Sequence, residues 1–548
     1  MNPPWRRRVL SSTDLTSEPI LASSPNMKPP RAEVTTTSTS PSPWPLQVLA
    51  IGLFLLCITY HLGMAARGFS AYRGQHLGAA LEYAKGRIDL LRPVIVGFNA
   101  NGAPTAYEFP IWQAAAAVFF KLFGLWFGWA NLTSLLFMLA GGWPLFQIAR
   151  LYLGVRGAWW TLVFFIAQPL VFFEAGRGGN NGCCCTFAVW FVFFGERLVR
   201  TGQIGWTIPA ALFGALSAVT NASFFFCAGL AVFFMLVVQH AKSPRRWILL
   251  AAVGLFAAGV FAAWTHYTSQ LAAQAEFSFV DLRLSGKTEG TSMVSLYFGD
   301  LRYRLNPAMW VKGAWHFFNG EFGSYVLLAL PIIGFFGLRR GLAHFWIAAA
   351  AATTLVFTNL VLQHYKYYLM FSPALALLCA AAMEPLEEHL FSGTWEKWRT
   401  CAIFGTGVLL GLAVLQGFMG MKVVLETDPY PEHIAQLIRQ YTSPNDKLLI
   451  EGGGLGGDEL FLSDRRGLSI WSTQFLEQPQ NLKRIQSLGF TRLVMISESP
   501  LLTAVQQSNP GGANISRRSY HPFLTPVAQG WKTLVENDDL LIRVIPPG

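Results

Sequence analysis

The sequence predicts a polytopic α-helical membrane protein with a small α/β domain near its C-terminus. The 548 residues are 53% hydrophobic and only 13% charged, whereas soluble proteins carry about 25% charged residues. Between residues 44 and 420, long apolar runs alternate with short polar breaks. From residue 421 onward the apolar runs shorten to strand length and alternate with helical stretches, which indicates a different kind of domain.

The first 43 residues predict a disordered tail. They are rich in Ser, Thr and Pro, with Arg6, Arg7 and Arg8 near the start. Such composition buries too little apolar surface to fold. A cleavable signal peptide is not expected, because the apolar region begins too late. We therefore interpret 1–43 as a cytoplasmic tail.

The transmembrane part, residues 44–420, is predicted to contain about eleven helices, since a span needs about 20 mainly apolar residues. The segments are 44–66, 129–149, 157–175, 183–198, 204–220, 222–239, 247–267, 323–338, 343–361, 367–383 and 401–420. The segment 111–124 is apolar but short, and we interpret it as an interfacial or re-entrant helix. If it crossed the membrane, the count would change.

Basic residues gather at every second break, which is the positive-inside pattern. They are Arg150, Arg156, Arg197, Arg200, Lys242, Arg245, Arg246, Arg339, Arg340, Lys397 and Arg399. The pattern predicts a cytoplasmic N-terminus. With an odd number of spans, the C-terminal domain lies on the outer face.

Two long outer loops are predicted, at 67–110 and 269–322. The first contains a helix from Gly74 to Gly86 with an apolar face, which would lie flat at the membrane surface. The second carries arginines among aromatic residues. Both loops fall on the face that also receives the short polar turns between helices.

Residues 421–548 predict a small α/β domain on the outer face. The strand-like runs are 447–450, 492–496 and 540–545, and the helical stretches are 432–441, 478–488 and 500–507. Alternating strands and helices are typical of such a domain.

Charge and cysteine content exclude some functions. The net charge of +11 does not indicate nucleic-acid binding, because many basic residues lie at helix ends and meet anionic lipid. All seven Cys lie within or at the ends of apolar segments, so no disulfide framework is expected. Cys183–Cys185 are consecutive and point in different directions on a helix, which favours packing over metal binding.

Polar residues at the outer ends of helices are candidate ligands, because such groups at membrane depth are costly. Arg177 could bind phosphate. Asn180 and Asn181 could hydrogen-bond a sugar or cap the next helix. Asn221 could be only a turn residue.

Two further segments on this face could bind a phosphorylated lipid. Arg302 and Arg304 lie beside aromatic residues and suit a polyanionic headgroup, although snorkelling to bulk lipid is an alternative. In the segment 364–368, His364 and Lys366 could hold a phosphate, and Tyr367 and Tyr368 could stack on a sugar. The alternative for the tyrosines is an interfacial aromatic belt.

At these segments the chain resembles the GT-C glycosyltransferases of bacterial membranes, near the protein O-mannosyltransferases and lipid A aminoarabinose transferases. The similar pieces are Tyr107–Gln113 at the end of a long first loop, the helix pair around Gln168-Pro169, Tyr297–Gly299 with Arg304, the segment from His364 to Pro373, and a soluble C-terminal domain. The resemblance covers most of residues 44–548. It implies transfer of a sugar from a polyprenyl-phosphate carrier on the outer face of a bacterial inner membrane.

The resemblance also implies an acidic residue after the first helix as general base, an Asp in the next outer turn, and often a later Lys. This sequence departs at all three places. His76 or Tyr72 lies near the expected first acid, Asn180-Asn181 replaces the Asp, and Asn221 replaces the Lys.

The candidate catalytic residues are therefore His76, Glu108 and Asp89, with Glu82 as a further alternative. Glu108 leads because it precedes the re-entrant segment. A neutral His near pH 7 could also act as base.

Three functions follow from these observations. The first is a hexosyl or pentosyl transferase that uses a lipid-phosphate-linked sugar, with Arg304 and Lys366 neutralising the departing phosphate. The second is a catalytically degenerate binder or transporter of lipid-linked glycan, which the missing acids favour. The third, a small-solute transporter, would need internal repeats that the sequence lacks. The expected partners are membrane lipid, the lipid-linked donor and a glycan, lipid or protein acceptor; no cofactor is implied and a metal is left open.

Overall fold

The computed structural model describes most of the chain beyond the predicted tail. The described residues are 43–66, 74–95, 97, 104, 108–175, 177–274, 277, 297–338, 341–390, 398–425, 429–452, 457–470, 472–497 and 525–547. The predicted tail lies outside them except for Pro43, as do the predicted helix at 500–507 and Tyr72. All statements below concern the described residues.

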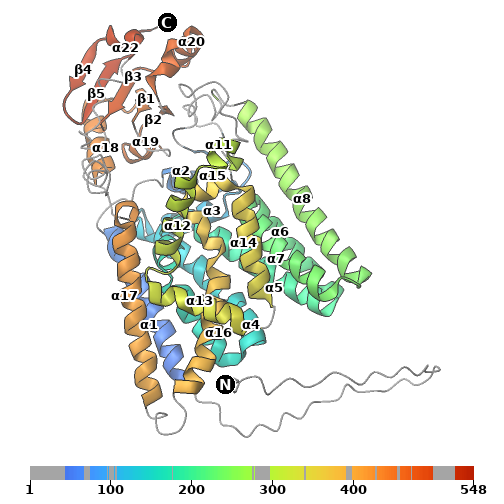
Figure 1. Ribbon diagram of the computed structural model, residues 1–548. Helices are drawn as coiled ribbons and strands as arrows, with labels where there is room; N and C mark the ends of the chain where they lie inside the picture. The colour runs from blue at the N-terminus through green and yellow to red at the C-terminus, as the bar shows by residue number, and fades with distance from the viewer. Residues whose placement is uncertain are drawn as a thin grey trace, which may run out of the picture. The chain divides into compact units, whose positions relative to one another are not determined.

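Apolar helices make up the first and larger part of the structure (Figure 1). Their bounds are α1 (Trp44–Ala66), α4 (Gly128–Ala167), α5 (Asn181–Thr201), α6 (Thr207–Thr220), α7 (Ala222–His240), α8 (Pro244–Ala273), α13 (Tyr325–Gly337), α14 (Leu342–Val356), α15 (Thr358–Gln363), α16 (Ser372–Leu390) and α17 (Arg399–Leu425). Six helices in the described part of the chain are long and apolar enough to cross a membrane, and a bent pair formed by α13 and α14 would make a seventh. All eleven predicted spans fall on helices, while the number that cross stays a prediction.

Helix α4 contains two of the predicted spans. At about 1.5 Å per residue, its 40 residues would be far longer than a hydrocarbon core of about 30 Å. The helix breaks at Gly154, where φ is +73° and ψ is −176°. Glycine adopts this conformation without steric cost, so the chain turns there between the two predicted segments.

Short helices surround one end of the long ones. α2 (Gly74–Lys85) confirms the helix predicted over 74–86, and it packs against α3 (Ile111–Phe123). At 13 residues, α3 is about 20 Å long, too short for a full span. A π-helix, η2 (Val171–Ala175), and a 3₁₀-helix, η4 (Tyr365–Met370), complete this region together with α11 (Leu301–Arg304) and α12 (Pro307–Glu321). A second 3₁₀-helix, η3 (Ile204–Trp206), connects the far end of α5 to α6.

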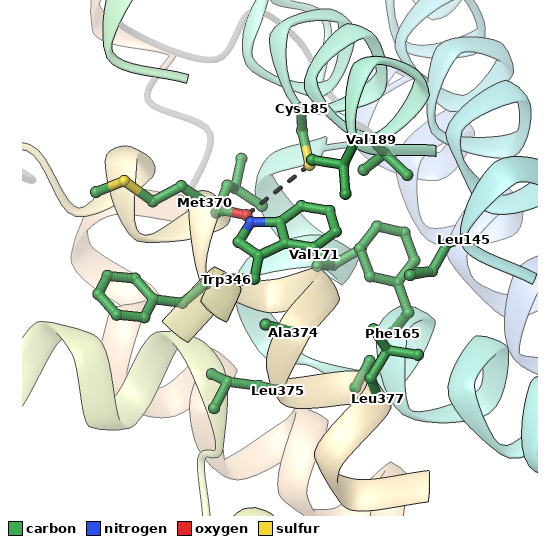
Figure 2. Packing of buried hydrophobic residues seen from close by; sticks show 14 of the residues in the cluster. Leu145, Phe165, Val171, Cys185, Val189, Trp346, Met370, Ala374, Leu375 and Leu377 are labelled. Carbon is green, nitrogen blue, oxygen red and sulfur yellow. Dashed lines mark hydrogen bonds between the residues drawn. The ribbon is translucent and has the colours of Figure 1, made fainter. Parts of the chain in front are cut away.

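The centre of the bundle is closely packed. In Figure 2, Trp346 lies among side chains from α4, α5 and α16, including Phe165, Val189 and Ala374. The Cys185 thiol donates to the Leu369 carbonyl, with a donor–acceptor distance of 3.8 Å. The described Cys183, Cys184 and Cys185 are buried and free, as expected for packing residues.

A buried carboxylate ties three helices together at one end of the bundle. Glu387 of α16 pairs with Arg156 of α4 and with Arg399 of α17, the latter at 3.2 Å. Trp160 also donates to Glu387, at 3.3 Å. Arg156 and Arg399 belong to the basic set predicted to be cytoplasmic, so part of that set holds helices together.

The C-terminal part contains a five-stranded mixed sheet in the order β2-β1-β3-β5-β4. The strands are β1 (Lys447–Glu451), β2 (Arg466–Ile470), β3 (Arg492–Ile496), β4 (Thr533–Glu536) and β5 (Leu540–Val544). β1 pairs in parallel with β2 and β3, while β5 runs antiparallel to β3 and β4. The helical elements are α18 (Tyr430–Tyr441), α19 (Asp458–Leu462), η6 (Thr473–Glu477), α20 (Pro479–Ser487) and α22 (Pro526–Gln529).

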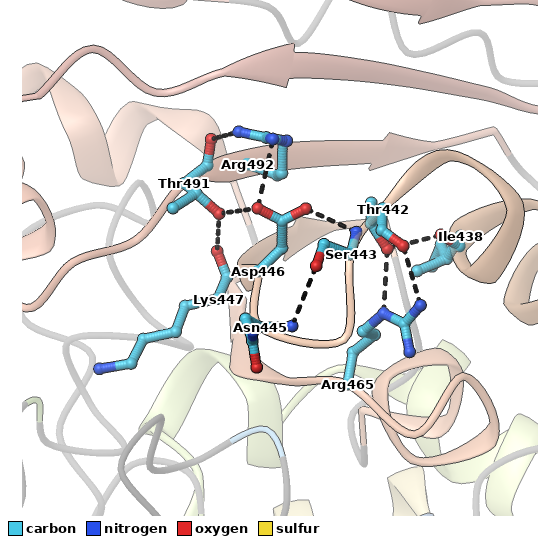
Figure 3. Close-up of polar contacts among 9 residues, drawn as sticks. All are labelled: Ile438, Thr442, Ser443, Asn445, Asp446, Lys447, Arg465, Thr491 and Arg492. Carbon is cyan, nitrogen blue, oxygen red and sulfur yellow. Dashed lines mark hydrogen bonds and ion pairs between the residues drawn. The ribbon is translucent and has the colours of Figure 1, made fainter.

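The turn before β1 is held by a carboxylate with three partners (Figure 3). Asp446 accepts hydrogen bonds from Thr491 at 2.6 Å and from the Ser443 backbone N–H at 2.7 Å, and Arg492 lies 3.3 Å away. Because Thr491 precedes β3 and Arg492 begins it, this carboxylate joins two neighbouring strands at their starting ends. The domain predicted from short alternating apolar runs is therefore an α/β unit.

Candidate active site

A cluster of polar side chains gathers where the ends of several elements meet. We call it the polar cluster. Its members are His76, Glu108, Gln113, Glu174, Arg177, Asn180, Asn181, Tyr365 and Lys366. They come from α2, α3 and the residue stretch before it, η2, the start of α5 and η4, so segments far apart in sequence form one site.

Glu108 is the acidic centre of the polar cluster. Its Oε2 accepts a hydrogen bond of 2.6 Å from the Asn180 amide. Burial raises the pKa of the Glu108 carboxyl, while Asn180 and the charge of Lys366 lower it. Among the described residues, no side chain hydrogen-bonds to the other oxygen, Oε1. A partly buried carboxyl with one oxygen held and one available suits a general base.

Glu174 has the opposite arrangement, because both of its oxygens are occupied. Asn181 donates to Oε1 at 2.6 Å, and the Tyr365 hydroxyl donates to Oε2 at 2.9 Å. The Arg177 guanidinium lies 3.8 Å from Oε2. Glu174 therefore holds Arg177 and Tyr365 in place. No role is predicted for Glu174 from the sequence. A carboxylate within the apolar run that starts at Val171 is the feature that could have indicated one, because such groups are costly at membrane depth.

The loop that carries Arg177 and Asn180 is fixed from behind by α4. The Gly178 N–H donates to Asn131 Oδ1 at 2.7 Å, and Asn131 donates to the His61 carbonyl at 2.8 Å. The His61 ring contacts the Phe172 carbonyl at 2.7 Å, within the π-helix that carries Glu174. Such π-turns often occur at functional sites.

Ser134 links this loop to α3. Its hydroxyl accepts from the Trp112 indole at 2.9 Å and from the Gly179 N–H at 3.1 Å. Trp112 precedes Gln113, and Gly179 precedes Asn180. Ser134 thus fixes the residues next to Gln113 and Asn180. In the described structure each of these two amides leaves a buried oxygen, Gln113 Oε1 and Asn180 Oδ1, without a hydrogen-bond partner.

Lys366 supplies the positive charge of the polar cluster. Its ammonium lies 5.7 Å from the centre of the Tyr367 ring. Burial and the charges of Lys366 and Lys312 lower the pKa of His364 to about 4. His364 is therefore neutral near pH 7, and its ring packs edge-on against Tyr367 at 6.2 Å.

His76 contacts the polar cluster through Gln113. The amide nitrogen of Gln113 lies 3.0 Å from Nδ1 of the ring. Burial, followed by the charge of Lys366, lowers the pKa of His76 to about 3. His76 is therefore a poor base, which corrects the expectation that a histidine poised near pH 7 could take that role.

Other predicted residues are engaged elsewhere. Asp89 Oδ1 accepts from the Leu91 N–H at 3.0 Å and so holds a local turn. The Arg304 guanidinium donates to backbone carbonyls, including those of Phe298 at 2.9 Å and Val356 at 3.1 Å, which caps the end of α14. These contacts correct the expectation that Arg304 neutralises a phosphate.

Arg302 and Tyr368 also lie apart from the polar cluster's hydrogen bonds. Arg302 is exposed on α11. Tyr368 is buried, and its ring packs against Phe317 with centroids 5.5 Å apart. Asn221 accepts from the Ser223 N–H at 3.2 Å and caps α7, which agrees with its interpretation as a turn residue.

Comparison with solved structures identifies the fold. Searches by sequence matched no family model and no curated protein. The crystal structure of ArnT from Cupriavidus metallidurans bound to undecaprenyl phosphate matches with a TM-score of 0.58 and 13% identity, over 93% of this chain and 100% of that one. The chain has the GT-C fold.

The apo structure of the same ArnT agrees, with a TM-score of 0.56 and 15% identity over 92% of this chain and 98% of that one. The GT-C fold is that of a multi-pass membrane protein, in keeping with the apolar helices. In the described part of the chain, no group of three or more His, Cys, Asp or Glu side chains could hold a metal ion.

Proposed function

We propose that this protein is a membrane glycosyltransferase that moves a sugar from a polyprenyl-phosphate carrier to an acceptor hydroxyl on the outer face of a bacterial inner membrane. In this proposal residues 44–420 form the transmembrane catalytic part, the N-terminus is cytoplasmic, and residues 421–548 form an outer domain. The observation that carries it is the partly buried Glu108, held by Asn180 and near the charge of Lys366. The match to a GT-C protein bound to undecaprenyl phosphate supports the donor class.

Each step of the reaction has a candidate residue. Oε1 of Glu108 takes the proton of the acceptor hydroxyl, whose oxygen then bonds to the anomeric carbon of the sugar. The bond between that carbon and the phosphate oxygen breaks, and the phosphate keeps the electron pair. Lys366 stabilises the negative charge that develops on the phosphate, and Arg177, held by Glu174, is a second cation for it.

In this proposal the remaining predicted ligands contact the sugar or lie near the phosphate. Asn180 and Asn181 offer amides to the sugar, and the Tyr367 ring offers a stacking surface beside Lys366. His364 is a neutral neighbour of the phosphate. The sugar could be a hexose or a pentose, and the acceptor a glycan, a lipid or a protein.

The test is a transfer assay with purified full-length protein in lipid, using radiolabelled polyprenyl-phosphate sugars and a crude envelope extract as acceptor. Glu108→Gln keeps the shape and the bond to Asn180 but removes the base, so turnover should fall about 10²–10⁴-fold. Lys366→Met should reduce turnover about 10²–10³-fold by removing the charge.

The controls are Glu477→Gln and Lys242→Met, which change exposed side chains of the same types and should leave turnover unchanged. Equal turnover in Glu108→Gln, Lys366→Met and the wild type would refute the site. Carrier binding without any product from the wild type would instead favour a degenerate binder of lipid-linked glycan.

A further inference from the structure

His76 contacts Gln113 of the polar cluster, and this hydrogen bond indicates a role other than that of a base. The Gln113 amide nitrogen, 3.0 Å from Nδ1, can only donate. In this orientation of the amide, Nδ1 accepts the hydrogen bond and is the unprotonated nitrogen of the ring. A neutral imidazole has one N–H, so its proton lies on Nε2.

The surroundings keep this ring neutral. It is partly buried, with Trp112 edge-on to it at a centroid distance of 6.1 Å. Burial, followed by the charge of Lys366, opposes a positive charge on the ring and lowers the pKa of His76 to about 3. Near pH 7 the ring is thus a donor through Nε2 and has no free acceptor nitrogen.

We propose that His76 donates a hydrogen bond from Nε2 to an oxygen of the carrier phosphate, and that Gln113 is the positioning residue that selects this tautomer. The inference rests on the proposed function, which assigns the phosphate to the neighbouring Lys366. His76 transfers no proton in this role. As the bond from the anomeric carbon to the phosphate oxygen breaks, its N–H stabilises the electron pair left on the phosphate.

The surroundings of Gln113 fix its side chain against the His76 ring. It is buried, and its Nε2 is directed at the ring, while its Oε1 is buried with no hydrogen-bond partner among the described residues. Trp112, the preceding residue, is anchored to Ser134 at 2.9 Å, so the start of α3 is fixed. The orientation of the ring is therefore set by the fold before any substrate binds.

Two substitutions of His76 distinguish a donor from a base. A Gln side chain places an amide N–H near the position of Nε2, whereas Asn places one near Nδ1. We expect transfer to fall about 10²-fold in His76→Ala and in His76→Asn, and to stay within about tenfold of wild type in His76→Gln. His76→Gln as inactive as His76→Ala would overturn the donor role, because a base cannot be replaced by an amide.

A change at Gln113 tests the tautomer. In Gln113→Glu the carboxylate accepts a hydrogen bond from an N–H at Nδ1, so that Nε2 is unprotonated in the neutral ring and protonated only when the ring is cationic. The donor role predicts a loss of transfer similar to that of His76→Ala at high pH, with partial recovery as the pH falls and the ring gains a second proton. A base role predicts the reverse, with activity kept or raised at high pH.

The proposed transferase function and the donor role of His76 can be refuted separately. If the wild type transfers sugar but His76→Gln and His76→Ala are equal, only this inference fails. If the wild type makes no product, the proposed function fails, and binding of undecaprenyl phosphate decides the donor role. His76→Gln should then bind it more tightly than His76→Asn, and equal affinities would overturn the inference.

Discussion

Asn180→Ala should move the acid limb of the pH–rate profile to higher pH. Asn180 donates to the Glu108 carboxylate at 2.6 Å, and this bond favours the ionised form and lowers the pKa of Glu108. If Glu108 is the base, kcat/KM rises as the pH passes upward through this pKa. Removing the bond raises the pKa, so more alkaline conditions are needed for the same rate.

The size of the shift follows from the bond. A hydrogen bond to a charged group contributes about 1.5–3 kcal/mol, and one pKa unit corresponds to about 1.4 kcal/mol. The acid limb should therefore move upward by about one to two pH units. Helix α5 should survive, because the Asn180 side chain makes no capping hydrogen bond.

The assay is kcat/KM for sugar transfer measured from acid to neutral pH, with Asn181→Ala as the matched control. Asn181 is the adjacent residue and makes a bond of the same length, 2.6 Å, but to Glu174. Its removal can lower the rate, yet it should leave the position of the acid limb unchanged. An unmoved limb in Asn180→Ala, or equal shifts in both variants, would refute Glu108 as the base.

Three further predictions concern residues that hold loops and helices in place. Asn131→Ala removes the bond to Gly178, so transfer should fall at least tenfold with carrier affinity little changed, measured by turnover and undecaprenyl-phosphate binding; a loss of affinity alone would contradict this. Glu387→Gln leaves two partly buried guanidinium groups without their carboxylate and should cost at most about 3–5 kcal/mol. The cost should be seen as a lower Tm, and an unchanged Tm would count against it. Gly334→Ala places a Cβ against the Leu378 carbonyl and should cost about 1–3 kcal/mol, whereas Gly337→Ala meets open space and should leave the Tm unchanged or higher.

The sequence predicts the helices well because their signal is local. A run of about 20 apolar residues is visible without knowledge of its neighbours, and each of the eleven segments falls on a helix. The strands β1, β3 and β5 are predicted for the same reason. β2 is missed because Gly467 and Ser469 interrupt its apolar residues, and Gly467 is present because a Cβ there would meet the Leu448 carbonyl.

The sequence predicts only part of the site. The predicted side of the membrane shows which residues share a face, but not which of them contact one another. It brings Glu108, Asn180 and Lys366 to one face, and the structure joins them in one cluster. It cannot show that Arg304 caps a helix end more than fifty residues away in sequence. Nor can it show which nitrogen of a histidine is available, since that depends on one amide of another helix.

Glu108 and Glu174 differ in role because two consecutive asparagines begin one helix. Neighbouring residues on a helix point in directions about 100° apart. Asn180 therefore reaches Glu108, while Asn181 reaches Glu174. Tyr365 completes the set of donors on Glu174 and leaves it no free oxygen, whereas Glu108 keeps one oxygen for substrate. In the proposed mechanism, a pair of amides at the place where the resemblance implies an Asp thus assigns one carboxylate to chemistry and the other to structure, which would allow acid-base catalysis without the expected acids.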